Sequence, residues 1–231
     1  MKKYTKNDPL TYVLGTTLVI ELLKTNKKLI NKIYLKSNFN KNASYDLITN
    51  LKGDIEVIES DKPFNILSKK DNIYVIAEIN KFENKFNKGN HLVLINPENE
   101  GNLGAIMRSA LGFGIKNIAI ITPSVDHFSP NVIRASMGAI FNLNIETYNS
   151  FNEYKNKYID FNYYPFMLKA TKDLKKISFK EPYSLIFGPE SSGLDDSFLN
   201  VGTPVIISHE PTIDSLNLPI AVSIALYESN D

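Results

Sequence analysis

The sequence of 231 residues contains no cysteine and only three histidines, His91, His127 and His209. The absence of cysteine excludes a thiolate nucleophile, a disulfide framework and a zinc site built on cysteine. The three histidines lie too far apart in the sequence to form a recognisable metal-ligand motif. Any catalysis must therefore use oxygen, amide or cationic groups.

Long apolar runs are also missing, since none approaches the roughly 20 residues that would span a bilayer. Residues 1–8 carry charges but lack the apolar stretch that follows such charges in a signal peptide. With 43% hydrophobic and 22% charged residues, the composition is typical of a soluble globular protein. We therefore expect a cytoplasmic protein with no membrane partner and no bound metal.

Charge is distributed unevenly, although the formal net charge of the whole chain is only +1. Residues 1–90 contain 16 Lys and 10 acidic residues, whereas residues 91–231 contain 8 Lys, 2 Arg and 15 acidic residues. The N-terminal part is therefore basic and the C-terminal part acidic. A basic part favours a polyanionic partner, and the alternative is a lysine-rich surface that only faces solvent.

The polar segment 80–90 separates two patterns of alternating helices and strands. We therefore expect a small α/β domain over residues 1–82, a linker over residues 83–90 and a larger domain over residues 91–231. The spacing of apolar residues in the small domain predicts a helix over 15–24 and strands over 32–35, 55–58 and 73–79.

In the larger domain, the pattern predicts strands over 91–95 and 117–121 with a helix over 103–113 between them. Further strands are expected near residues 143, 166, 185 and 205. This alternation indicates an α/β fold with a parallel sheet. The glycines after the first strand do not give the G-x-G-x-x-G spacing, which excludes the dinucleotide-binding motif.

The helix over 103–113 presents an arginine, Arg108, away from its apolar face. Only 2 of the 26 basic residues are arginine, Arg108 and Arg134, which suggests that these positions need the planar guanidinium for a phosphate or a carboxylate. Arg134 follows Ser129, a predicted N-cap, and Pro130. It could bind a carboxylate within the fold or act at the site. The residues predicted to form the buried face are Leu103, Ile106, Met107, Ala110 and Leu111.

Two later segments also combine a strand end with polar residues. The strand near residue 185 runs into a Gly/Pro loop that carries Glu190, and the strand near residue 205 leads to Ser215 and Asn217. The helix that follows, over residues 220–227, is apolar all round and is expected to be buried. Ser215 could simply be its N-cap.

Together these segments resemble the SpoU-like (TrmH) branch of the SPOUT class of RNA methyltransferases. The first family motif is similar to residues 102–106 with Arg108 and Ala110, the second to residues 187–190 with 193–194, and the third to residues 215–217 leading to 226–228. The helix after Ser129 is also similar. In the N-terminal part, residues 12–15 and 19–23 resemble a substrate-binding domain related to kink-turn-binding ribosomal proteins, which implies that residues 1–82 bind RNA.

The resemblance implies that the second and third motifs form a deep trefoil knot, an exception to the rule that chains do not thread loops. It implies S-adenosylmethionine as the cofactor, held by backbone groups of Gly188, Ile207 and Leu216, with Thr171 a weaker candidate. It also implies a homodimer, in which the apolar C-terminal helix would face both the core and the partner.

The implied reaction is methyl transfer to a ribose 2′-hydroxyl of structured ribosomal or transfer RNA. Arg108 is expected to position the substrate phosphate and hydroxyl, because an arginine resists the deprotonation that a base would need. The resemblance assigns the orientation of the loops, the hydroxyl and Arg108 to Asn102, Glu190, Ser215 and Asn217.

The third motif departs from the family pattern, with Ser208-His209 in place of Pro-Met, Pro211 in place of Gly and Leu218-Pro219 in place of Val-Ser. The cofactor loop is therefore expected to differ locally, and His209 could lie near the adenine or face solvent. One alternative function is a non-catalytic RNA-binding or ribosome-assembly protein on the same scaffold. Another is a methyltransferase that confers antibiotic resistance. The target RNA cannot be identified from the sequence.

Overall fold

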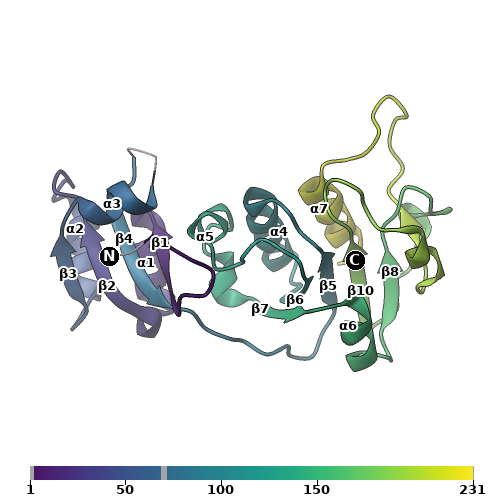
Figure 1. The fold of residues 1–231 in the computed structure, drawn as a ribbon, viewed down its shortest axis with the longest axis horizontal. Helices are drawn as coiled ribbons and strands as arrows, with labels where there is room; N and C mark the ends of the chain where they lie inside the picture. The colour runs from purple at the N-terminus through teal and green to yellow at the C-terminus, as the bar shows by residue number, and fades with distance from the viewer. Residues whose placement is uncertain (1–2, 69–71, 231) are drawn as a thin grey trace. The chain divides into compact units, whose positions relative to one another are not determined.

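The computed structural model describes residues 3–68 and 72–230. Its contacts divide the chain into two compact units, which are described separately. The first unit comprises Met1–Phe82 and Asp126–Phe141, and the second comprises Glu83–Val125 and Asn142–Asp231. Figure 1 shows the elements of both. None of the helices in the described ranges is long and apolar enough to pass through a bilayer.

The first unit is built on a four-stranded sheet with the order β1-β4-β2-β3. Strand β4 runs antiparallel to β1 and β2, whereas β3 is parallel to β2. The strands are β1 (Leu10–Leu14), β2 (Ile30–Leu35), β3 (Glu56–Glu59) and β4 (Val75–Asn80). The helices are α1 (Thr16–Thr25), α2 (Ala43–Leu51), α3 (Lys62–Leu67) and α5 (Pro130–Ala135), with a 3₁₀ turn at Lys27–Leu29.

The segment Asp126–Phe141 belongs to the first unit, although the predicted domain boundary places it in the second domain. The Thr11 hydroxyl donates to the carbonyl of Phe128 at 2.5 Å, and the Tyr4 hydroxyl donates to the carboxylate of Asp126. The rings of Phe82 and Phe128 meet edge to face at 5.1 Å. Burial, followed by the Asp126 carboxylate, raises the pKa of Tyr4, so its hydroxyl keeps the proton that it donates. The two hydrogen bonds join residues more than 100 positions apart in the sequence.

The second unit contains a parallel five-stranded sheet with the order β7-β6-β5-β10-β8. This confirms the predicted α/β fold class, and the trefoil knot stays a prediction. The strands are β5 (His91–Ile95), β6 (Asn117–Ile121), β7 (Asn144–Tyr148), β8 (Asn162–Pro165) and β10 (Tyr183–Phe187), with a parallel pair of β9 (Lys172–Asp173) and β11 (Val205–Ile206). The helices are α4 (Glu100–Gly112), α6 (Phe151–Lys157) and α7 (Leu218–Glu228), with 3₁₀ turns at Leu174–Lys176 and Asp196–Asn200.

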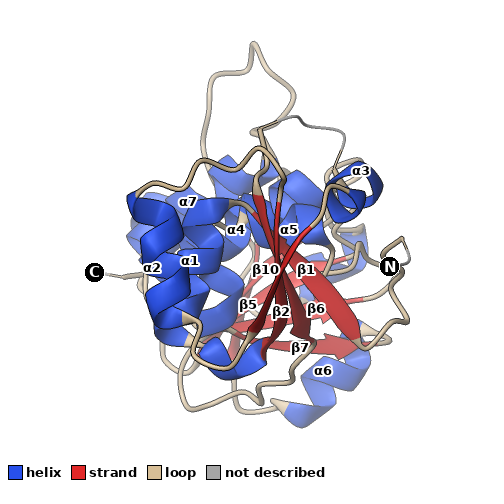
Figure 2. Cartoon of the chain, turned by 90° about the vertical axis from the view of Figure 1, so that its left-hand side faces the viewer, coloured by secondary structure: helices blue, strands red, loops and turns tan. Residues whose placement is uncertain are grey.

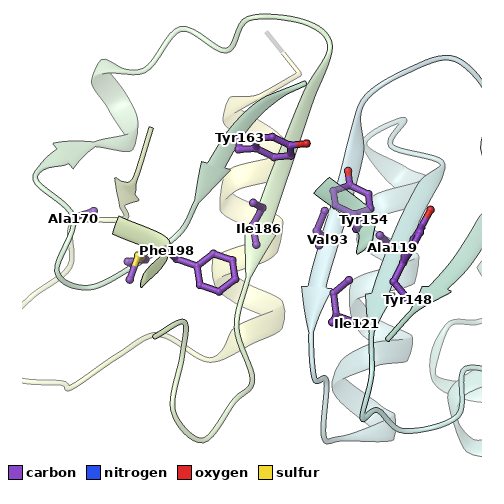
Figure 3. Packing of buried hydrophobic residues seen from close by; sticks show 10 residues of the cluster. Val93, Ala119, Ile121, Tyr148, Tyr154, Tyr163, Ala170, Ile186 and Phe198 are labelled. Carbon is purple, nitrogen blue, oxygen red and sulfur yellow. The ribbon is translucent and has the colours of Figure 1, made fainter. Parts of the chain in front are cut away.

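Helices cover both faces of this sheet, with α4 and α7 on one side and α6 on the other (Figure 2). Alternation along β5 places Val93 on the α6 face and its neighbours Leu92 and Leu94 on the opposite face. Figure 3 shows the cluster on the α6 side, where Val93 and Ile186 of adjacent strands lie among tyrosine and phenylalanine rings. Apolar residues on both faces explain why these strands are continuous hydrophobic runs.

Helix α7 is not buried all round, contrary to the prediction. Its buried residues are Val222, Ala225 and Leu226, whereas Ile220 is 53% exposed and Tyr227 is 59% exposed. A composition that is apolar on every side cannot show which side meets the sheet. The exposed side is therefore available to a further partner.

The segment 83–90, which the sequence predicts to be a linker, packs on the second unit. The Asn84 amide donates to the carbonyl of Leu143 at 3.0 Å, and the backbone N–H of Phe86 donates to the Glu146 carboxylate at 3.0 Å. The Phe86 ring lies 4.7 Å from the ring of His91. These contacts hold the segment against β5 and β7.

His91, at the first position of β5, belongs to a buried polar chain under aromatic rings. Its Nδ1 lies 2.8 Å from the Tyr154 hydroxyl, which lies 2.6 Å from the hydroxyl of Ser184. Burial lowers the pKa of His91 to about 4. His91 lies at the start of β5, at the edge of the sheet opposite to the carboxyl ends of the strands. The hydrogen bonds that link His91, Tyr154 and Ser184 therefore have a structural role.

The low pKa of His91 makes stability depend on pH. Since an unfolded histidine titrates near 6.5, the unfolded chain binds the extra proton first, and the free energy of unfolding should fall by about 3 kcal/mol between pH 7 and pH 4. Burial also lowers the pKa of His127 to about 4, so His127 further lowers the free energy of unfolding as the pH falls over the same range. Denaturant unfolding across this range should show a weaker pH dependence in His91→Asn, which retains a nitrogen near Nδ1 but does not titrate. An unchanged slope would contradict the assignment to His91.

Candidate functional site

The predicted site residues lie in the second unit, four of them after the carboxyl ends of β5 and β10 and the other five after β8 and β11. Strands β5 and β10 are adjacent and parallel, so the loops that follow them emerge at the same edge of the sheet. Ligands of open parallel sheets bind outside the carboxyl ends of the strands. The loops carry the first two motifs, with Asn102 on one side and Glu190 on the other.

Glu190 joins these two loops through its carboxylate. Its Oε2 accepts the backbone N–H of Glu98 at 3.0 Å. Its Oε1 accepts the backbone N–H of Asn99 at 3.2 Å and the side-chain amide of Asn102 at 3.1 Å. A further bond runs from the Ser191 hydroxyl to the Glu98 carboxylate at 3.1 Å. A carboxylate that accepts three N–H groups is held in one orientation.

The start of helix α4 explains why Asn102 can reach Glu190. Asn99 is the N-cap, and its side-chain oxygen accepts the backbone N–H of Asn102 at 3.0 Å. The Asn102 side chain is therefore free to donate to the neighbouring loop. The position of Glu190 also favours the helix, because a negative charge stabilises a helix N-terminus. We refer to Glu190, Asn102 and the N–H groups of Glu98 and Asn99 as the Glu190 clamp.

Arg108 lies on the same helix and is exposed, as predicted. Four residues of the predicted apolar face are buried, whereas Leu111 is only partly buried. Across residues 3–68 and 72–230, the guanidinium of Arg108 makes no hydrogen bond or ion pair. Its five donors are therefore available to an external anion. Arg134 is half-buried in α5 and belongs to the first unit.

A cavity of about 500 Å³ lies beside the loop that follows β10. Five of the predicted site residues line it: Gly188, Glu190, Ile207, Ser215 and Leu216. Its lining does not include the other four, Asn102, Arg108, Thr171 and Asn217. Thr171 is exposed just before β9. The cavity therefore collects the predicted cofactor-binding residues except Thr171.

Gly188 is required by a close approach of the backbone. A Cβ at this position would lie 2.3 Å from the carbonyl carbon of Gly193 and 2.4 Å from the nitrogen of Leu194. Gly193 has φ +67°, which lets the loop turn back on the end of β10. Glu190 therefore lies in a loop whose two ends, Gly188 and Gly193–Leu194, are in direct backbone contact.

Gly188→Ala is expected to displace this loop and to remove cofactor binding, because overpacking against backbone costs about 1–3 kcal/mol or more. Gly193→Ala is the matched control. A Cβ there meets nothing within 4 Å, so only the left-handed backbone is strained, at about 1–2 kcal/mol. Calorimetric titration with S-adenosylhomocysteine and thermal unfolding measure the two effects. Equal cofactor affinity in wild type and Gly188→Ala would contradict the role of this approach.

The third motif places Asn217 at the N-cap of α7. Its carbonyl accepts the N–H groups of Ile220 and Ala221, each at 3.0 Å, although its side chain makes no capping bond. The alternative that Ser215 caps this helix is therefore wrong, since Ser215 is exposed two residues earlier and lines the cavity. Pro219 lies in the first turn, where a missing N–H costs no helical bond.

The cavity also contains residues that the sequence did not indicate. The ammonium of Lys169 contacts both oxygens of Asp196, at 2.7 and 2.8 Å, and both side chains are about two thirds exposed. Leu168, 58% exposed, and the carboxylates of Asp195 and Asp214 also line it. No motif or spacing connects these residues, because the fold alone brings them together. In the described part of the chain, no cluster of three acidic or histidine side chains could hold a metal ion.

Comparison with known proteins agrees with this geometry. Residues 89–227 match the SpoU rRNA Methylase family. An uncharacterized tRNA/rRNA methyltransferase from Synechocystis sp. is 35% identical over 141 residues, which are 60% of this chain and 52% of that protein. The chain spans about half or less of the length of the curated relatives it matches.

Two crystal structures have the same fold over nearly the whole chain. The AdoMet-bound rRNA methyltransferase from Sinorhizobium meliloti matches with a TM-score of 0.79 at 22% identity, covering 95% of this chain and 86% of that one. An RNA 2′-O ribose methyltransferase matches with a TM-score of 0.77 at 23% identity, covering 95% and 87%. The family match includes the Arg108 helix, the Glu190 clamp and the whole cavity lining. The chain therefore belongs to the SpoU rRNA methylase family.

Proposed function

We propose that this protein transfers a methyl group from S-adenosylmethionine to a ribose 2′-hydroxyl of structured ribosomal or transfer RNA. The observation that carries the proposal is the Glu190 clamp, which fixes the loop beside the cavity to the helix that presents Arg108. Family membership and the 2′-O ribose methyltransferase with this fold support the same chemistry.

The cavity fits the proposed cofactor. Its volume of about 500 Å³ lies within the range of small-molecule sites. Phe166 and Phe187 contribute apolar surface to the lining, and its acidic residues, among them Asp214, complement a positively charged ligand. Backbone groups of Gly188, Ile207 and Leu216 would hold the cofactor, with Thr171 a weaker candidate because it lies outside the lining. When bound, S-adenosylmethionine supplies a methyl group on a cationic sulfur, activated for attack by an oxygen.

Arg108 would bind the RNA rather than remove a proton. A 2′-hydroxyl is a poor nucleophile, so the site must hold it in line with the methyl group and let its proton pass to solvent as the oxygen–carbon bond forms. The guanidinium offers a planar fork of donors that matches a phosphate. The bonds of Asn102 and Glu190 would fix the start of the helix on which Arg108 lies. Ser215 and Asn217 would orient the third loop on the other side of the cavity.

The basic N-terminal domain, residues 1–82, would provide the surface that selects the RNA. It contains 14 of the 16 lysines of residues 1–90, and these would attract the phosphate backbone. The resemblance to kink-turn-binding proteins supports this role. Within residues 91–231, the second unit would form the methyltransferase part, and residues 83–90, which pack on this unit, would lead into it.

A homodimer would cover the exposed side of α7. Ile220 and Tyr227 lie on this side, and the Tyr227 ring lies 6.1 Å from the ring of Phe113 on the turn after α4. Isologous contacts would place the same apolar patch on both protomers. Sedimentation equilibrium is expected to give a dimer at micromolar concentration, and a monomer would argue strongly against this assembly.

Methyl transfer is tested with labelled S-adenosylmethionine and total ribosomal or transfer RNA, followed by mass spectrometry of the nucleosides. We expect a 2′-O-methylnucleoside in one RNA fraction with wild type and none with Arg108→Ala. A base-methylated product would overturn the assignment to the ribose. A wild-type protein that binds no cofactor would instead support the non-catalytic RNA-binding alternative.

A further inference from the structure

His209 lines the cavity from the loop that follows β11, at a position where this sequence departs from its family. Its side chain is half-buried, and its Nδ1 lies 2.9 Å from the carbonyl oxygen of Ile207. A carbonyl can only accept a hydrogen bond. Nδ1 therefore carries the proton of this contact, which determines the tautomer of the neutral ring.

In this tautomer Nε2 has no proton and is a hydrogen-bond acceptor. No residue among 3–68 and 72–230 makes a hydrogen bond to Nε2 of His209. We propose that Nε2 accepts a hydrogen bond from an N–H donor of the bound cofactor and so contributes to cofactor recognition. This assignment rests on the proposed function, because it takes the cavity to be the cofactor site.

The backbone around His209 is held in place, so the ring is positioned before a ligand binds. Strand β11 pairs with β9, with Ile206 opposite Asp173. The hydroxyl of Ser208 donates to the carboxylate of Asp173, which lowers the pKa of that carboxyl group. An acceptor fixed in advance discriminates against ligands that lack the matching donor, because it would otherwise remain unpaired.

The cofactor has two kinds of N–H donor, the exocyclic amine of adenine and the α-ammonium of its amino-acid part. The carboxylates of the lining, among them Asp195 and Asp214, already suit an ammonium. Nε2 of His209 differs from these carboxylates, because an uncharged acceptor suits the neutral amine of adenine as well as it suits the ammonium. Ligands that lack one donor or the other distinguish the two sources.

Two variants separate the functions of the two ring nitrogens. In His209→Asn, the side-chain nitrogen lies near the position of Nδ1 and keeps the bond to the Ile207 carbonyl, but the acceptor at Nε2 is lost. In His209→Gln, the longer side chain places a carbonyl oxygen near Nε2 and restores the acceptor. Thermal unfolding of both variants checks that the substitution at position 209 leaves the fold intact.

The test is calorimetric titration of the full chain with S-adenosylhomocysteine. We expect about tenfold weaker binding in His209→Asn and affinity within about threefold of wild type in His209→Gln, as for one lost hydrogen bond. Two analogues then locate the donor: the inosine analogue lacks the exocyclic amine, and 5′-methylthioadenosine lacks the ammonium. The difference between wild type and His209→Asn should vanish with the analogue whose missing group His209 contacts.

Wild-type affinity in His209→Asn would overturn the assignment and leave His209 with only its bond to Ile207. Equal weakening in the Asn and Gln variants would also overturn it, since Gln restores the acceptor. If wild type bound S-adenosylhomocysteine poorly or not at all, the proposed function itself would fail. The two failures are therefore distinguishable in one set of titrations.

Discussion

Replacing Arg108 by lysine is expected to lower the turnover of methyl transfer by about 100-fold or more, while cofactor affinity stays within about threefold. Lysine keeps the charge but replaces the planar fork of donors by a single ammonium. The cavity lining does not include Arg108, so cofactor binding should not depend on it. Single-turnover methyl transfer with a saturating RNA fraction measures the first effect, and calorimetry with S-adenosylhomocysteine measures the second.

A charge-matched control separates positioning from general attraction of RNA. Lys116 is exposed just before β6, at the edge of the sheet opposite to the site. Both Arg108→Ala and Lys116→Ala remove one positive charge, but only the first should abolish turnover. Near-normal turnover of Arg108→Lys would show that a point charge is enough. Equal losses in the two alanine variants would show that Arg108 acts only through net charge.

Glu190→Gln is expected to weaken cofactor binding by at least tenfold and to lower turnover further. The substitution leaves one oxygen where the carboxylate has two, so the N–H groups of Glu98, Asn99 and Asn102 can no longer all be satisfied. Each charge-assisted bond contributes about 1.5–3 kcal/mol. Loss of the clamp would free the loop beside the cavity and the start of the helix that carries Arg108.

A double-mutant cycle with Asn102→Ala tests whether the clamp acts as a unit. We expect a coupling free energy of about 0.5–3 kcal/mol in turnover, because the two side chains bond directly. Ser191→Ala is a useful comparison, since Ser191 contacts Glu98 and leaves Glu190 intact. Additive effects of the Glu190 and Asn102 substitutions would mean that the clamp does not connect the loop to the helix.

The sequence predicts the centre of the second unit well, because there local pattern and tertiary environment agree. The apolar runs at His91–Ile95 and Asn117–Ile121 are strands with these same bounds. The periodicity of α4 also predicts that Arg108 points away from the buried face. Both strands are covered on two faces, so hydrophobic content alone identifies them.

Contacts between distant segments could not be predicted in this way. Asn102 and Glu190 are 88 residues apart, and only the adjacency of β5 and β10 brings them together. The pairing of Lys169 with Asp196 has no sequence pattern. Strand β1 and helix α6 were missed because short elements have weak periodicity. Helix α7 was expected to be buried on every side because its composition is uniform, whereas burial depends on what lies opposite.

The place of Asp126–Phe141 in the first unit affects any attempt to dissect the protein. The chain passes between the two units three times, after Phe82, after Val125 and after Phe141. A single cut after residue 82 would therefore leave the first unit without Asp126–Phe141, and the second unit would carry this segment as an insertion. The C-terminal fragment would keep α5 without β1, exposing Phe128, whose carbonyl would lose the Thr11 hydroxyl as its donor. Separate expression of the methyltransferase part is thus expected to give an aggregation-prone product, and co-expression of both fragments should restore solubility.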